Sequence, residues 1–138
     1  MLPEMIQASF VPMLFIPSGT NHVEFYSRAL HAVSLREWRN DDGTLHVSEL
    51  IIGDALLHIH EESVEKGKFS PARISGVTSS IGLMVEDVDA VMQLAVKEGA
   101  KELSPAQDYD YGYRQGELED PFGHKWIIQK RITNWLIG

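Results

Sequence analysis

The stretch Tyr111 to Trp126, YGYRQGELEDPFGHKW, constrains the fold more than any other part of the chain. Its first half alternates well enough to form a strand. Asp120-Pro121-Phe122-Gly123 then supplies a turn, because proline presets one φ angle and glycine permits a positive φ. We expect His124 to close this turn by hydrogen bonding and a second strand to run from His124 to Arg131. The stretch therefore predicts a β-hairpin near the end of the chain.

The residues of the first half of the chain predict one helix and four strands. Short apolar or alternating runs, separated by turn residues such as Asn40-Asp41-Asp42-Gly43, predict strands at Phe10–Ile16, Leu35–Arg39, Leu45–Ile51 and Ala55–His60. Val23, Tyr26 and Leu30 recur at helical spacing and predict a helix over about residues 20–31. The expected order is strand, helix and three strands.

The second half repeats this order. Ser79 to Val85 is predicted to be a strand, and an apolar helical face begins at Val88 and ends at Gly99, a residue preferred just past a helix. Lys101 to Leu103 is weakly strand-like, and the hairpin supplies the last two strands. The chain therefore contains two βαβββ units.

Aligning the two units places Val11 on Ser80 and His58 on Ile127. Because one such unit cannot bury its apolar face alone, we expect an α+β fold in which both units form a curved, partly closed mixed sheet with the helices outside. We expect a single domain over residues 1–138, with unit 1 at about 8–60, a linker at 61–76, unit 2 at about 77–131 and a tail at 132–138.

Composition narrows the class of protein. The chain has 138 residues, of which 43% are hydrophobic, and this is enough for one domain with a sizeable core. Twenty acidic and twelve basic residues give a net charge of −8, which disfavours binding to nucleic acid or to an anionic membrane. Cysteine is absent, and no apolar run approaches the roughly 20 residues of a membrane span. We therefore expect a soluble cytoplasmic protein that has neither nucleic-acid nor membrane partners.

The hairpin stretch resembles the vicinal oxygen chelate (VOC) superfamily, which comprises glyoxalases, bleomycin resistance proteins and extradiol dioxygenases, and in particular its PhnB-like branch. In that branch an aromatic-Gly-x-Arg-x-Gly strand leads into Asp-Pro-Phe-Gly-His-x-Trp. The matching residues here are Tyr111, Gly112, Arg114, Gly116, Asp120, Pro121, Phe122, Gly123, His124 and Trp126. The resemblance covers about residues 8–131, and it implies the same two-unit fold and a homodimer.

The resemblance also implies where a divalent metal would be held. Enzymes of the superfamily use one side chain from the first and from the last strand of each unit, and those positions fall on Val11, His58, Ser80 and Ile127. His58 is the one good transition-metal ligand among them, whereas a catalytic site usually needs about three protein ligands. We therefore expect no cofactor. The alternative is a divalent metal ion whose missing ligands come from substrate or from a partner chain.

Period-2 alternation predicts which side chains line the cavity. The expected face is largely apolar and carries polar groups at His58, His60, Ser80, Lys125 and Gln129. His58 and His60 point the same way from one strand, so they could contribute to a metal site or form a neutral pair bonded to carboxylates or water. Such a lining suits a small organic molecule held by one or two hydrogen bonds.

Arg114 and Trp38 are further candidates for ligand binding. The guanidinium of Arg114 could clamp a carboxylate or phosphonate, or it could form a salt bridge with Glu117, Glu119 or Asp120. The ring of Trp38 could stack on a planar ligand, or it could lie in the core.

The leading functional hypothesis is a glyoxalase/bleomycin-resistance-like protein that binds a small organic molecule in a sheet-lined cavity, without the usual metal site. The alternative is a divalent-metal-dependent lyase, isomerase or dioxygenase of the same superfamily. The residue types identify no catalytic group, and they do not identify the ligand.

Overall fold

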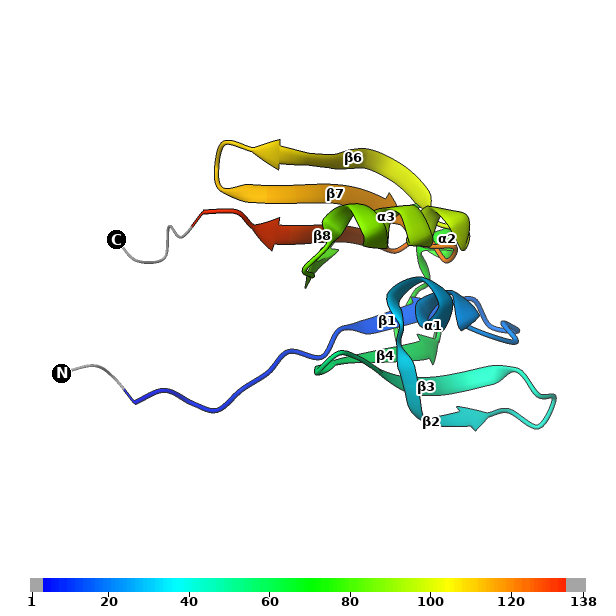
Figure 1. Ribbon diagram of the computed structural model, residues 1–138. Helices are drawn as coiled ribbons and strands as arrows, with labels where there is room; N and C mark the ends of the chain where they lie inside the picture. The colour runs from blue at the N-terminus through cyan, green and yellow to red at the C-terminus, as the bar shows by residue number, and fades with distance from the viewer. Residues whose placement is uncertain (1–3, 134–138) are drawn as a thin grey trace.

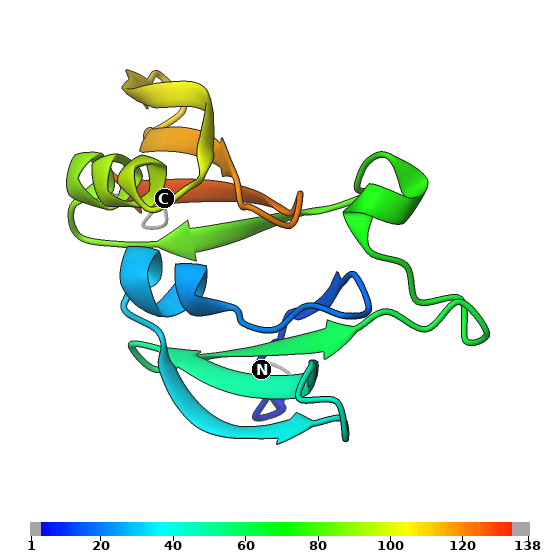
Figure 2. The same ribbon diagram turned by 90° about the vertical axis from the view of Figure 1, so that its right-hand side faces the viewer.

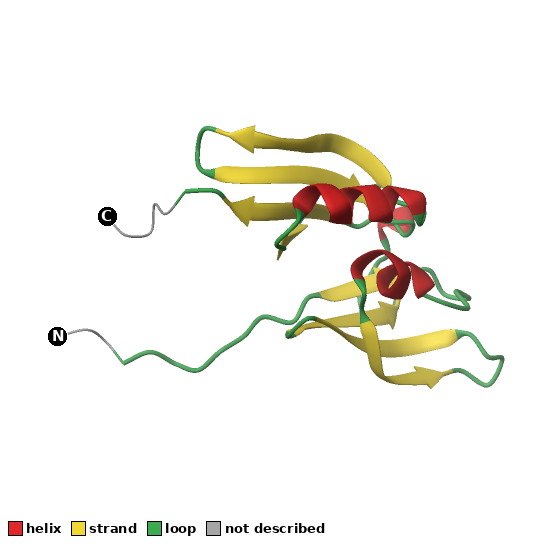
Figure 3. Cartoon of the chain, in the orientation of Figure 1, coloured by secondary structure: helices red, strands yellow, loops and turns green. Residues whose placement is uncertain are grey.

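The computed structural model describes residues 4–133, which form two four-stranded sheets and three helices (Figure 1). The first unit contains β1 (Met13–Ile16), α1 (Glu24–Leu30), β2 (Val33–Arg39), β3 (Leu45–Ile52) and β4 (Ala55–Glu61). The short helix α2 (Pro71–Ile74) follows. The second unit contains β5 (Ser80–Met84), α3 (Val88–Lys97), β6 (Lys101–Tyr109), β7 (Tyr113–Glu119) and β8 (Lys125–Arg131). Figure 3 shows the same alternation of helices and strands in each half.

Strand pairing shows that the two units are repeats of one topology. The first sheet has the order β1-β4-β3-β2 and the second has β5-β8-β7-β6. In each sheet the first strand runs parallel to the last strand of its unit. Met13 is the partner of His58, and Gly82 is the partner of Ile127. The α+β fold with two βαβββ units, and the predicted equivalence of His58 with Ile127, are therefore confirmed.

The arrangement of the sheets differs in detail from the expected one. Within residues 4–133 the two sheets stay separate and do not close into one curved sheet. Helix α1 lies between them (Figure 2), and it contacts α3. A helix in this position lets both sheets share one apolar core, so neither unit has to bury its inner face alone.

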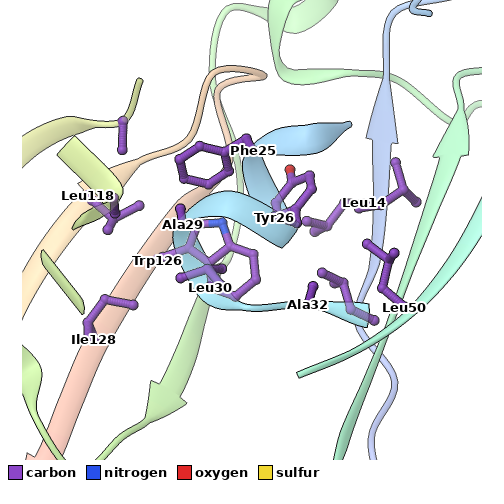
Figure 4. Packing of buried hydrophobic residues seen from close by; sticks show 14 of the residues in the cluster. Leu14, Phe25, Tyr26, Ala29, Leu30, Ala32, Leu50, Leu118, Trp126 and Ile128 are labelled. Carbon is purple, nitrogen blue, oxygen red and sulfur yellow. The ribbon is translucent and has the colours of Figure 1, made fainter. Parts of the chain in front are cut away.

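The shared core contains side chains from both sheets and from the helices. Tyr26 of α1 lies 6.1 Å from the ring of Trp126 on β8, measured between ring centroids, while Leu14 of β1 packs on the other side of the helix (Figure 4). Burial follows the predicted alternation, because Leu57, Ile59, Trp126 and Ile128 are all buried.

The predicted Asp120–Gly123 turn is confirmed, and its carboxylate joins the two units. Gly123 has a φ of +94°, and its amide donates to the Asp120 carbonyl at 2.9 Å. The buried Asp120 carboxylate accepts hydrogen bonds from the Tyr26 hydroxyl at 2.5 Å and from Trp126 Nε1 at 3.0 Å. It also accepts from the backbone amide of His124 at 3.1 Å. The motif turn of the second unit therefore holds α1 of the first.

Helix α2 lies within the segment 61–76 that was predicted to be a linker, and three predicted element boundaries differ most from the observed ones. Strand β1 begins at Met13, so residues 4–12 form an extended N-terminal arm rather than the start of a strand. Helix α1 begins at Glu24. Strand β6 runs to Tyr109, far past Leu103, and its register shifts on both sides of Ser104. An edge position with an irregular register is what allows a strand to contain Pro105, because proline cannot donate to the ladder.

Candidate functional site

The face of the first sheet opposite α1 exposes aromatic and ionisable side chains. Neighbouring rungs of the sheet place His58 opposite Glu49, and His60 beside Phe15. Trp38 of β2 lies on the same row of paired residues across the sheet as Phe15 and His60. We call this surface the histidine face, and it comprises Phe15, Trp38, Glu49, His58 and His60. Three of the predicted ligand-binding residues, namely Trp38, His58 and His60, thus lie on one surface.

His60 lies at the centre of the histidine face. Its Nε2 is the one buried side-chain nitrogen or oxygen in residues 4–133 that lacks a hydrogen-bond partner. The ring centroids of Phe15 and His58 each lie 6.1 Å from that of His60. Burial, followed by electrostatic interactions with His58 and Lys68, lowers the pKa of His60 from its ordinary value. The imidazole is therefore neutral at pH 7 and can offer one hydrogen bond as donor or acceptor.

Charged groups flank His60 on two sides. Arg36 Nε donates to the Glu49 carboxylate at 2.8 Å, and this hydrogen bond lowers the pKa of Glu49. The same guanidinium lies 4.7 Å from the ring centre of Trp38. On the other side, Lys68 Nζ lies 5.9 Å from the ring centre of Phe15. The Glu49 carboxylate is therefore already paired with Arg36. Lys68, which belongs to the linker, adds a positive charge near Phe15.

Ser80 and Gln129 lie on the second sheet, on the face that corresponds to the histidine face. Ser80 is exposed at the start of β5 and pairs in register with Lys125. Gln129 extends across β5, because a Cβ atom on Gly82 would lie only 2.8 Å from Gln129 Nε2. The glycine thus leaves the space that the glutamine occupies. Within one chain these two residues belong to a different sheet from the histidines.

The structure places Arg114 on the opposite face of the second sheet, beside α3. Its Nε and one terminal nitrogen donate to the two carboxylate oxygens of Asp89, each at 2.8 Å. Its other terminal nitrogen donates to Asp108 at 2.9 Å. The salt-bridge alternative for Arg114 is therefore observed, with Asp89 and Asp108 in place of the expected Glu117, Glu119 or Asp120. A guanidinium held by two carboxylates ties α3 and β6 to β7.

The side chains do not fit a metal ion at the positions that the resemblance implies. Among residues 4–133, no group of three or more His, Asp or Glu side chains lies close enough together to hold a metal. His58 has Met13 beside it on β1, and the equivalent pair in the second sheet is Gly82 and Ile127. These neighbours cannot complete a coordination sphere.

Two features of this surface were missed in the sequence. Lys68 lies in the polar linker, where no periodicity indicates which side chain turns back to the sheet. The pairing of Glu49 with Arg36 could have been found from cross-strand register, because the two residues are partners in the β2–β3 hairpin. The His124 ring also makes a contact outside the turn that it was expected to close, because its Nε2 donates to the Phe15 carbonyl on β1 at 2.9 Å.

Comparison with known proteins identifies the family. The family model described as "Glyoxalase/Bleomycin resistance protein/Dioxygenase superfamily" matches residues 11–128. This match spans most of the chain, and the protein belongs to that superfamily. No helix within residues 4–133 has both the length and the apolar character needed to cross a membrane.

Two mycobacterial proteins are related to this chain in sequence. The uncharacterized protein Mb0911c of Mycobacterium bovis is 31% identical over 130 residues, covering 92% of this chain and 86% of that protein. The uncharacterized protein Rv0887c of Mycobacterium tuberculosis is also 31% identical over 130 residues, covering 92% of this chain and 76% of that protein.

Solved structures share the fold at low identity. TioX from Micromonospora sp. ML1 has a TM-score of 0.66 at 20% identity, and the match covers 92% of this chain and 98% of TioX. The fosfomycin resistance protein FosX from Mesorhizobium loti has a TM-score of 0.66 at 13% identity, with 96% and 97% of the two chains covered. At these identities the likeness concerns the fold.

Proposed function

We propose that this protein binds a small organic molecule on the histidine face, without a bound metal, and that a second copy of the chain completes the cavity. The observation that carries the proposal is His60 Nε2, which is buried and has no hydrogen-bond partner within residues 4–133. A polar atom in this state costs free energy unless another group satisfies it, and a ligand that displaces the side chains covering this nitrogen would supply that group.

The surroundings of His60 suit a planar or partly apolar ligand. Phe15 and Trp38 present aromatic surface on the same rung, and Trp38 is 43% exposed. Aromatic surface with a few fixed polar groups is the usual composition of a small-molecule site. The match of Tyr111–Trp126 to the motif further supports placing the chain in the PhnB-like branch of the superfamily.

Replacing His60 with phenylalanine is expected to separate binding from folding. The substitution removes a buried polar atom that has no partner, so the free energy of unfolding should stay the same or rise. Ligands found in a thermal-shift screen of small organic molecules should bind about tenfold more weakly or worse, because one hydrogen bond to the imidazole is lost. Titration calorimetry with the best hit measures this change.

The matched control is His22→Phe, because His22 is exposed and lies away from the histidine face. The control should bind the hit as the unchanged protein does. Equal affinity of the His60 and His22 variants would refute the proposed site, and so would a screen without any hit.

The exposed apolar surface supports a homodimer. In the N-terminal arm, Met5 is 87% exposed, Ile6 86% and Phe10 97%. Figure 1 shows this arm running away from the rest of the molecule. Met13 and Met84 also expose about half of their surface on the open faces of the two sheets. Apolar surface of this extent is typical of a protein interface.

We expect light scattering to report a dimer at micromolar concentration. Phe10→Ser combined with Ile6→Ser should shift the equilibrium towards monomer, because both changes remove exposed apolar surface. Val64→Ser is the control, since Val64 is 54% exposed but lies in the linker. A monomer at every concentration would contradict the homodimer.

The metal-dependent alternative is tested by elemental analysis after dialysis without chelator. We expect no stoichiometric transition metal, because His58 and His60 alone leave most of a coordination sphere to water. About one metal per chain, lost in His58→Ala, would support a lyase, isomerase or dioxygenase instead.

A further inference from the structure

A cavity lies at the junction of the two units, separate from His58 and His60. It has a volume of about 220 Å³ and is lined by β1, by the segment from Phe69 to Ser79 and by the starts of β5 and β8. The proposed function does not involve this junction pocket, which shares only β1 side chains with the histidine face. Its shape and chemistry therefore need their own explanation.

The wall of the junction pocket is fixed in place. The buried Glu62 carboxylate accepts hydrogen bonds from the amide and the hydroxyl of Ser70, each at 3.0 Å, and from Arg73 Nε at 2.9 Å. On the other side, Pro71 packs so closely on Gly123 that an added Cβ there would lie 2.8 Å from Pro71 Cβ. Helix α2 is therefore held by Glu62 on one side and by the Gly123 turn on the other, which fixes this wall of the pocket.

The lining combines apolar and polar surface, and its large apolar side chains are partly uncovered. Met13 is 53% exposed, Phe69 38% and Ile74 50%, although all three border the same cavity. Three large apolar side chains around one hollow favour a ligand with an apolar body, because its binding would remove their surface from water. The volume is below the roughly 300 Å³ at which pockets for drug-sized ligands begin, so the ligand would be small.

The polar groups of the junction pocket define the other end of the ligand. Among residues 4–133, Lys125 is the one cationic side chain in the lining, and no carboxylate of these residues lines the cavity. The ammonium group of Lys125 forms no ion pair with any residue between 4 and 133, although Glu119 is its partner in register. Burial lowers the pKa of His124, so this histidine contributes a neutral imidazole. In a chain with a net charge of −8, an unpaired lysine at the edge of an apolar pocket favours an anionic group.

We propose that the junction pocket binds a small monocarboxylate whose apolar part, an aromatic ring or a branched chain, fills the hollow between β1 and α2. The carboxylate accepts a hydrogen bond from Lys125, and Thr78 and Ser79 belong to the same lining. The apolar part covers Ile74 and Phe69.

Benzoate and its neutral counterpart benzamide are suitable probes for the full-length chain. We expect benzoate to bind about tenfold more tightly than benzamide, because only benzoate offers a charged acceptor to Lys125. Lys125→Gln should remove this preference by weakening benzoate about tenfold and leaving benzamide unchanged. Lys66→Gln is the matched control, since Lys66 is an exposed lysine of the linker that does not line the pocket.

A second variant tests the position of the ligand. Ile74→Glu places a carboxylate at the exposed edge of the pocket and should abolish benzoate binding without unfolding the protein. His60→Phe should leave benzoate binding unchanged, which separates this pocket from the histidine face. The proposal is overturned if benzoate does not bind at millimolar concentration, or if Lys125→Gln binds it as Lys66→Gln does. The proposal is also overturned if His60→Phe loses benzoate binding while Lys125→Gln and Ile74→Glu retain it.

Discussion

Asp120→Ala is expected to lower the free energy of unfolding by about 3 to 5 kcal/mol, because it leaves several buried donors without an acceptor, at about 1 to 3 kcal/mol each. The carboxylate is almost fully buried and accepts from Tyr26, Trp126 and the backbone amides of Phe122 and His124. Alanine leaves these four donors without their acceptor in a site that water does not reach. Urea denaturation followed by circular dichroism measures the loss.

Asp110→Ala is the matched control, because Asp110 is an exposed aspartate near the β6–β7 turn. We expect that variant to stay within about 0.5 kcal/mol of the unchanged protein. Tyr26→Phe removes one donor and should fall between the two. A loss below about 1 kcal/mol for Asp120→Ala would mean that the carboxylate does not connect the units as described.

The hydrogen bonds of Asp120 show why the motif in Tyr111–Trp126 could predict the fold. Sequence reasoning predicted the turn and the hairpin, because proline and glycine determine local backbone angles. It did not predict that Asp120 binds a tyrosine 94 residues away, or that the His124 ring reaches a carbonyl 109 residues away. Such partners depend on how the two units pack, and periodicity within a strand does not contain that information.

The repeat and the two faces of each sheet were predictable for a different reason. Period-2 alternation assigns side chains to faces, and a matched order of elements aligns the halves, so His58 and Ile127 could be placed before their pairing was known. Arg114 was harder to assign. Its position on β7 indicated a face, but its carboxylate partner Asp89 comes from α3, 25 residues earlier.

The state of His60 could not have been predicted from the sequence. Alternation indicated that His58 and His60 share a face, yet both a neutral pair and a metal pair fitted that pattern. The difference between the two side chains arises from packing, because His60 Nε2 is buried beside Phe15 without a partner within residues 4–133. A buried nitrogen without a hydrogen-bond partner can be identified only from the three-dimensional packing around it.

Glu62→Gln is expected to destabilise the protein by about 1.5 to 3 kcal/mol at pH 7, through the loss of charged hydrogen bonds. Arg73 and Ser70 bind the carboxylate, and together they lower the pKa of Glu62 from 4.5 to about 2. Because the folded pKa lies below the unfolded one, this stabilisation is complete above about pH 4.5 and is lost as the pH falls towards 2. The difference between the unchanged protein and the variant should therefore shrink steadily below pH 4.5.

Urea denaturation at pH 7, pH 5 and pH 3 measures that difference directly, because contributions from the other acidic groups cancel between the two proteins. Glu65→Gln is the control, since Glu65 is exposed in the same linker and should show little effect at any of these pH values. A difference for Glu62→Gln that is as large at pH 3 as at pH 7 would show that the carboxylate is not ionised when it holds α2. The wall of the junction pocket would then depend on the shape of the side chain rather than on its charge.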